Sequence, residues 1–230
     1  MNSTEILETL RVVSLPGANP DIDQLSDYTS AYAMWKLVWL ETFGELDGLD
    51  RIYSDDFSRQ DEMLCIFRGA ACLAMGALRR RDLSMPTVRE DSYFKIWPPE
   101  AIDALSRNGC DIIICSYLTV HPMARRKALG LPMKDIMSGL LLRRLLETGA
   151  AAMTGTMRAD RGMHETTFRF GATLLVPDLM LHNAPVDLVA FFPQNVMDGE
   201  AEVAEAVRYL WSSKRQVTDR WRPRMETCHA

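Results

Sequence analysis

Residues 110–149 decide the fold, and they read CDIIICSYLTVHPMARRKALGLPMKDIMSGLLLRRLLETG. The first part, residues 111–120, is an almost continuous apolar and β-branched run, which predicts a strand buried on both faces. A short loop rich in positive charge follows and ends at Gly130. From residue 134 to residue 146, apolar residues recur at helical spacing. The stretch therefore predicts a strand, a cationic turn and a helix.

A turn of this kind suits a phosphate group. It places free backbone N–H groups and the positive end of a helix dipole at one point. Three basic side chains, Arg125, Arg126 and Lys127, add to that field. We therefore expect a phosphate or pyrophosphate ligand, and the plain alternative is a solvated basic surface.

Composition places limits on the class of protein. The chain has 230 residues, 47% of them hydrophobic, which is enough for one sizeable domain with short extensions. Its net charge of -5 does not indicate general binding to nucleic acid or to an anionic membrane. The five cysteines lack metal-ligand spacing, so we expect reduced thiols and no metal. There is no signal-peptide layout and no apolar run long enough to span a bilayer, which predicts a soluble, cytoplasmic protein.

The remaining patterns give the order of the other elements. Residues 1–26 hold a short apolar segment and a Pro-Gly-Ala-Asn-Pro breaker. Residues 27–46 show a broad aromatic helical face. Two apolar runs flank Arg68-Gly69 and predict a hairpin over 62–79. Further along we expect loops over 50–60 and 82–97, helices over 101–106, 164–170 and 199–211, and strands over 151–157, 172–180 and 186–192.

This order predicts an α+β fold with a mixed, mainly antiparallel central sheet flanked by helices. Hairpins connect the strands before the cationic turn, whereas helices alternate with strands after it. We expect an N-terminal arm over 1–26, one main domain over 27–195 and a C-terminal helical extension over 196–230.

The layout over residues 27–192 resembles the GNAT (Gcn5-related N-acyltransferase) superfamily. The segment VHPMARRKALG, residues 120–130, is similar to that family's acyl-donor loop, whose pattern is Arg or Gln, two residues, Gly, one residue, and Gly or Ala. Arg125 takes the first position and Gly130 the last, and Ala128 stands where the first glycine is usual. The segment FRFGA, residues 168–172, is similar to the family's closing aromatic-and-glycine segment.

The resemblance implies a site for the pyrophosphate of coenzyme A or the phosphopantetheine of an acyl carrier protein. The pantetheine is expected to run along the end of the central strand, where backbone N–H groups would polarise the thioester carbonyl. The donor-binding residues expected on this basis are Leu118, Thr119, Val120, Arg125, Arg126, Lys127, Ala128, Leu129 and Gly130.

Within the superfamily, the front half is similar to the long-chain N-acyl amino acid synthases and the acyl-homoserine lactone synthases. The features that carry this likeness are the aromatic helix near Trp35, the acidic loop before the hairpin, and the Pro- and Phe-containing loop over 85–94. The lactone synthases carry a glutamate and an arginine in the central strand. This chain has Ile-Cys-Ser-Tyr at 114–117, which disfavours lactone synthesis.

The resemblance does not supply a catalytic acid. Many members use a tyrosine in the short helix after the fifth strand, and the matching residue here is Thr167. We therefore consider Tyr117, on the central strand, and His164, at the start of the short helix, as catalytic candidates. His121 is a weaker candidate. The plain alternatives are a packing role for the tyrosine and structural roles for the histidines.

Two patterns bear on the substrates. Methionines gather in the sequence around the donor loop, which favours a medium or long acyl chain over acetyl, although a methionine-rich core gives the same pattern. Asp61 and Glu62 are candidates to hold an amine, with hairpin surface charge as the alternative.

The sequence thus predicts an N-acyltransferase. The donor is acyl-CoA or an acyl carrier protein, and the acceptor is a small primary amine such as an amino acid. The alternative is a binding or regulatory module that keeps the fold and the donor loop but has lost the chemistry, a reading motivated by Thr167 and Ala128. We expect no nucleic-acid partner and no integral membrane association.

Overall fold

The computed structural model describes residues 3–213. Its strands are β1 (Leu10–Pro16), β2 (Glu62–Arg68), β3 (Ala71–Asp82), β4 (Asp111–Val120), β5 (Ala152–Arg158), β6 (Thr173–Leu181) and β7 (Ala184–Phe191). Its α-helices are α1 (Ser3–Glu8), α2 (Leu25–Asp47), α3 (Asp55–Ser58), α4 (Pro86–Arg89), α5 (Pro99–Leu105), α6 (Arg126–Leu129), α7 (Met133–Thr148), α8 (Met163–Arg169) and α9 (Ala201–Ser212). Its 3₁₀ helices are η1 (Ile22–Gln24), η2 (Ser92–Phe94), η3 (Pro122–Ala124) and η4 (Pro193–Asn195).

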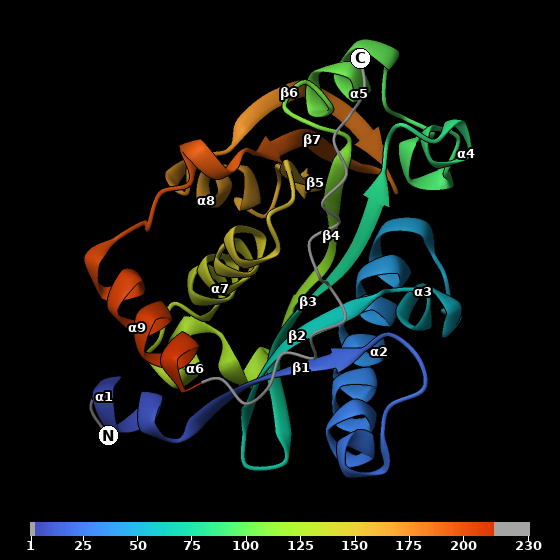
Figure 1. Ribbon diagram of the computed structural model, residues 1–230. Helices are drawn as coiled ribbons and strands as arrows, with labels where there is room; N and C mark the ends of the chain where they lie inside the picture. Colours follow the sequence, from blue (N-terminus) through green and yellow to red (C-terminus); the bar gives the residue numbers. More distant parts are fainter. Residues whose placement is uncertain (1–2, 214–230) are drawn as a thin grey trace. The chain divides into compact units, whose positions relative to one another are not determined.

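The strands bond in the order β1-β2-β3-β4-β5-β7-β6 (Figure 1). The β1–β2, β2–β3, β5–β7 and β6–β7 pairs are antiparallel, and β4 and β5 run parallel. The predicted α+β class with a mixed, mainly antiparallel sheet is therefore confirmed. The chain divides into two compact units, and both β3 and β4 contribute one part to each.

The first unit contains β1, β2, α2, the last part of β4, the basic loop over residues 121–130, the start of α7, and α9. The aromatic face of α2 packs on the β1–β2–β3 layer, with Met34 and Trp35 buried against Leu15, Met63 and Met75. This packing explains the helix predicted over 27–46, since its apolar positions are those that meet the sheet. The helix ends at Gly48, whose φ of 70° is the left-handed conformation usual after a helix.

The predicted N-terminal arm contains a strand that the sequence did not reveal. Leu10 to Pro16 pair in register with Arg68 to Glu62 of β2, and all but one of the seven residues of β1 are buried. The segment therefore belongs to the sheet and is not a separate arm. The buried carboxylate of Glu62 accepts a hydrogen bond from the Ser14 hydroxyl at 2.8 Å, which gives Glu62 a structural role.

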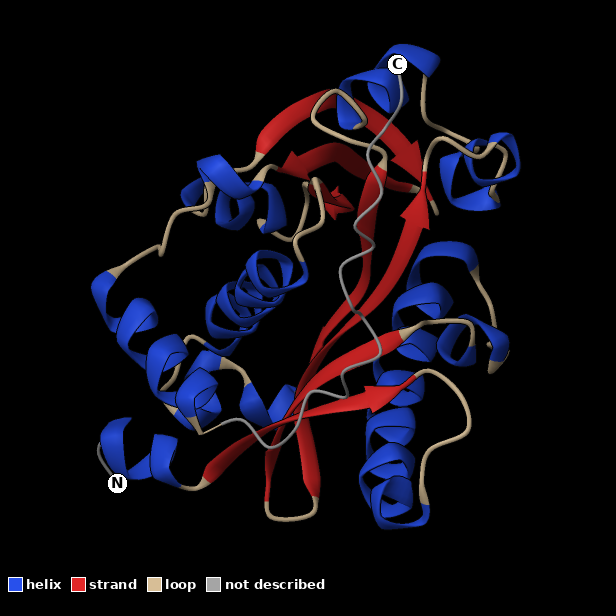
Figure 2. Cartoon of the chain, viewed as in Figure 1, coloured by secondary structure: helices blue, strands red, loops and turns tan. Residues whose placement is uncertain are grey.

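The second unit contains the end of β3, the start of β4, β5, β6, β7, α5 and α8. Figure 2 shows short helices between β3 and β4, where the sequence predicted an irregular loop over 82–97. This segment is part of the core, because Phe94 and Trp97 are buried in one cluster with Ile112 and Ile114 of β4. The predicted loop over 50–60 likewise contains a short helix, α3.

The β6 strand is irregular. Its register against β7 shifts twice between Leu174 and Leu179, and Asp178 has a φ of 56°. The Asp178 N–H donates to the Asp187 carboxylate at 3.1 Å, which holds the irregular backbone in place.

Two further expectations concern membranes and the C-terminus. Among residues 3–213, no helix combines the length and apolar character needed to cross a membrane. Helix α9 corresponds to the helix predicted over 199–211, and the rest of the predicted extension lies outside the described residues.

Candidate functional site

Strand β4 matches the central strand predicted over 111–120, but its backbone is not regular. Tyr117 has a φ of 53°, a left-handed conformation that is uncommon for a residue other than glycine. Its half-buried ring is held edge-on by two residues of α2, with ring-centre distances of 5.7 Å to Trp35 and 5.0 Å to Trp39. The strand is therefore deformed at Tyr117, and the aromatic face of α2 fixes this geometry.

Thr119 connects the deformed strand to α2. Its side chain is buried, donates to the Tyr117 carbonyl at 2.7 Å and accepts from the Trp39 indole N–H at 2.8 Å. The Thr119 hydroxyl is therefore occupied within the protein. Any contribution of this residue to a ligand would come from its backbone.

The loop after β4 begins with a histidine that holds the chain in place. The His121 N–H donates to the Leu73 carbonyl at 2.8 Å, and its Nδ1 accepts from the Met123 N–H at 3.1 Å. These bonds make His121 the N-cap of η3. They support a structural role for His121 over a catalytic one.

The basic part of the loop forms one helical turn, α6, before α7 begins. Within it, the N–H groups of Ala128 and Leu129 donate to the Arg125 carbonyl, and that of Gly130 donates to the Arg126 carbonyl. Gly130 closes the turn with a φ of 78°. The first N–H groups of a helix have no partner inside it, and in α6 these are the N–H groups of Arg126 and Lys127. The side chains of Arg125 and Arg126 are exposed.

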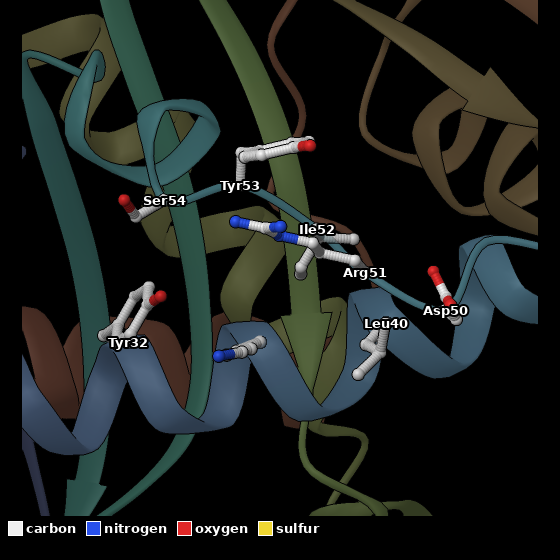
Figure 3. A pocket seen from close by; sticks show the side chains of 8 residues that line it. Tyr32, Leu40, Asp50, Arg51, Ile52, Tyr53 and Ser54 are labelled. Carbon is white, nitrogen blue, oxygen red and sulfur yellow. The ribbon is translucent and has the colours of Figure 1, made fainter.

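A pocket of about 390 Å³ lies in the same unit, between α2 and the segment that precedes α3 (Figure 3). It is lined by Tyr32, Lys36, Leu40, Asp50, Arg51, Ile52, Tyr53 and Ser54. The Arg51 guanidinium lies 4.6 Å from the centre of the Tyr53 ring, and the Lys36 ammonium lies 6.0 Å from that of Tyr32. The pocket therefore offers two cations, one carboxylate and two aromatic faces.

This pocket is joined to the aromatic cluster around β4. Tyr32 lines the pocket on one side and stacks on Trp35 at 5.9 Å on the other, and Trp35 contacts Tyr117. A molecule in the pocket would thus lie two ring contacts away from the deformed part of β4.

The other catalytic candidate, His164, lies on α8 in the second unit, whereas Tyr117 belongs to the first. Within residues 3–213, the Nδ1 atom of His164 is buried without a hydrogen-bond partner. Thr167, which the sequence resemblance matched to a tyrosine, is buried, and its hydroxyl donates to the His164 carbonyl at 2.8 Å. Thr167 therefore has no proton to offer a ligand in this arrangement.

A group that the sequence did not single out lies near the start of β4. The hydroxyl of Tyr93, from η2, is buried. Cys115 of β4 and Thr154 and Thr156 of β5 lie beside it. The hint in the sequence was the long aromatic segment over 82–97, but no pattern distinguished Tyr93 from its neighbours.

The ionisation of the Cys115 thiol reports on burial in this part of the second unit. Burial raises the pKa of Cys115 to about 12, above the ordinary thiol value of 9.0. The pKa of Cys115 is higher in the folded protein than in the unfolded chain. The protonated thiol therefore contributes its full share to the free energy of unfolding below pH 9, and this contribution is lost as the pH rises towards 12.

We therefore expect the free energy of unfolding to fall between pH 8 and pH 10 by about 1.4 kcal/mol more in the wild type than in Cys115→Ala. Urea denaturation of both proteins at several pH values in this range measures the difference. Parallel curves would contradict the assigned burial of the thiol.

Solved structures place this arrangement in a known fold, although no protein-family model and no curated protein matches the sequence. BjaI, a CoA-dependent acyl-homoserine lactone synthase solved with SAM and isopentyl-CoA, is 14% identical, with 86% of this chain and 88% of that chain covered and a TM-score of 0.55. LasI, an acyl-homoserine lactone synthase, is 13% identical, with 91% and 97% covered and a TM-score of 0.51. FeeM, an N-acyl amino acid synthase from uncultured soil microbes, is 10% identical, with 81% and 93% covered and a TM-score of 0.48. The chain therefore has the GNAT-like fold of the acyl-homoserine lactone synthases.

Proposed function

We propose that this protein is an N-acyltransferase that moves an acyl group from acyl-CoA, or from an acyl carrier protein, to a small primary amine. One observation carries the proposal: within one unit, the deformed strand β4 leads directly into an exposed basic turn that precedes α7. An arrangement of this kind can hold the phosphates of an acyl donor beside the end of a strand, along which its thioester arm can run.

The reaction needs a site for the donor's phosphates, stabilisation of the carbonyl oxygen, and groups that transfer protons. The amine nitrogen attacks the thioester carbon, a C–N bond forms, the C–S bond breaks, and the thiolate leaves and takes up a proton, while the amine loses one. In our proposal Arg125 and Arg126 bind the phosphates, and backbone N–H groups over 118–120 stabilise the negative charge on the carbonyl oxygen. Tyr117 and His164 are the proposed groups for proton transfer.

The pocket beside α2 is the proposed acceptor site. An α-amino acid carries a carboxylate and an ammonium group, and the pocket lining offers Arg51 and Lys36 for the first and Asp50 for the second. This complementarity favours an amino acid over an amine that lacks a carboxylate.

A second candidate function is supported by a specific contact. The Thr167 hydroxyl donates its proton to a carbonyl of its own helix. The residue matched to the acid of many GNAT members therefore does not offer a proton here. A module that binds an acyl thioester without turning it over would also fit this feature.

Release of free thiol separates the two functions. We expect the purified protein to release CoA from acyl-CoA donors with chains of two to twelve carbons when amino acids are present, with turnover that continues beyond one equivalent. The matched acceptors are an amino acid and the amine formed by removing its carboxylate, and the amino acid should be preferred. Binding of acyl-CoA without thiol release for any amine would support the module instead.

A further inference from the structure

The pocket beside α2 (Figure 3) carries more positive charge than a simple amino acid needs. Its lining includes two cations, Lys36 and Arg51, and one carboxylate, that of Asp50. An amino acid with an uncharged side chain has one carboxylate and one ammonium group, which together engage one cation and Asp50. The second cation is left without a counterpart on such a ligand.

The two cations occupy separate positions in the pocket. The Lys36 ammonium lies 6.0 Å from the centre of the Tyr32 ring, and the Arg51 guanidinium lies 4.6 Å from the centre of the Tyr53 ring. Within residues 3–213, neither cation forms an ion pair with a carboxylate of the protein. A cation that lies against a ring keeps N–H groups with which it can donate to an anion. The pocket therefore offers two distinct places for a negatively charged group.

The acidic residues next to the pocket are paired with a cation of their own. Asp55 and Asp56 of α3 follow the lining residue Ser54 in the chain. The Arg59 guanidinium lies 3.7 Å from the Asp55 carboxylate and also donates a hydrogen bond to the Asp56 carboxylate. Recognition of an anion in the pocket therefore depends on direct contact with its two cations and not on the net charge of the region.

The order of the lining residues assigns a partner to each group of the ligand. Asp50 and Arg51 are consecutive in the chain and line the same pocket, just as the α-ammonium and α-carboxylate groups of an amino acid share one carbon. The guanidinium of Arg51 presents two parallel N–H groups, which suits a carboxylate. Lys36 comes from α2, a different element, and is left for a group further from the α-carbon.

We propose that the acceptor is an acidic amino acid, aspartate or glutamate, whose side-chain carboxylate is bound by Lys36. This rests on the proposed function, in which the pocket is the acceptor site. The pocket, Tyr117 and the basic loop over residues 121–130 all belong to the first unit. The charges then match group by group, with two carboxylates of the ligand on two cations and its ammonium group on Asp50.

Four acceptors test the choice of amino acid. Aspartate and asparagine are nearly equal in size and differ in the charge of the side chain, and glutamate and glutamine form a second such pair. With one acyl-CoA donor, the release of free thiol gives kcat/KM for each acceptor. We expect the wild type to prefer an acid over its amide by about fivefold to twentyfold, because a hydrogen bond between two charged groups is stronger than one to a neutral amide.

Lys36→Gln tests the residue assigned to the side-chain carboxylate. Lys36 is exposed, so the variant should unfold in urea as the wild type does. We expect the preference for acid over amide to fall to less than about threefold, because the cation that distinguishes the two has been removed. Arg208→Gln removes one exposed positive charge from α9 of the same unit and is the matched control, which should keep the wild-type preference.

The outcomes separate this inference from the function on which it rests. Thiol release at equal kcat/KM for acids and amides would overturn the inference and leave the acyltransferase in place. So would a Lys36→Gln variant that keeps the full preference for the acids. A wild type that releases no thiol with any amine would reject the proposed function itself, and with it the use of the pocket as an acceptor site.

Discussion

Replacement of Arg125 and Arg126 together by alanine is expected to weaken acyl-CoA binding about 10- to 100-fold, which corresponds to about 1.4–2.8 kcal/mol. Arg125 is the N-cap of α6 and Arg126 is its first residue, and both side chains are exposed. They therefore contribute little to the fold, and their loss should change the free energy of unfolding by less than about 0.5 kcal/mol. Their proposed role is charge-assisted hydrogen bonding to phosphate, which is stronger than bonding between neutral groups.

Titration calorimetry with one acyl-CoA at two salt concentrations measures this effect. The wild-type affinity should fall as salt rises, and the double variant should be less sensitive, because the charges that salt screens have been removed. Arg208→Ala, which removes an exposed arginine from α9, is the control and should bind as the wild type does. A double variant with wild-type affinity would mean that the basic turn is only a solvated surface, the plain alternative that its sequence allowed.

Gly171→Ala is expected to lower the free energy of unfolding by at least about 3 kcal/mol. Gly171 follows α8 with a φ of 86°, and a Cβ on it would lie 1.9 Å from the Asn195 carbonyl oxygen. The clash is with backbone, so no side-chain rotation relieves it. The segment is also tied in place, because the Met197 N–H donates to the Phe170 carbonyl at 3.1 Å.

Gly149→Ala is the matched control in the same unit. Gly149 follows α7 with a φ of 70°, but a Cβ there would have no atom within 4 Å, so only the backbone strain of about 1 kcal/mol applies. Urea denaturation of the two variants separates the steric part of the effect from the conformational part. Equal losses would show that the contact between Gly171 and Asn195 is not as tight as the structure has it.

The elements that the sequence predicted well are those with a strong local signal. The run over 111–120 became β4 with both ends as predicted, and the aromatic periodicity over 27–46 became α2. Strand β1 was missed because seven residues that end in proline carry a weak local signal, and only pairing with β2, some fifty residues away, makes them a strand. The short helices between β3 and β4 have too few turns to show a period.

Some residues of the candidate site could likewise be identified from the sequence, and others could not. Arg125 and Gly130 could be recognised because a motif fixes their spacing. The left-handed Tyr117 could not, since residues in that conformation are usually glycine or asparagine and its geometry depends on two tryptophans of another element. The buried hydroxyl of Tyr93 could not be recognised either, because its burial depends on packing against a cluster that includes Ile112 and Ile114 of β4.

The irregular β6 has a consequence for self-association. Among residues 3–213 it is the last strand in the order of the sheet, so no described strand pairs with its outer side. Pro177 has no N–H to donate there, the two register shifts bend the strand, and the left-handed Asp178 interrupts its line of hydrogen-bonding groups. A straight incoming strand cannot bond along the full length of such an edge, which disfavours strand addition at β6.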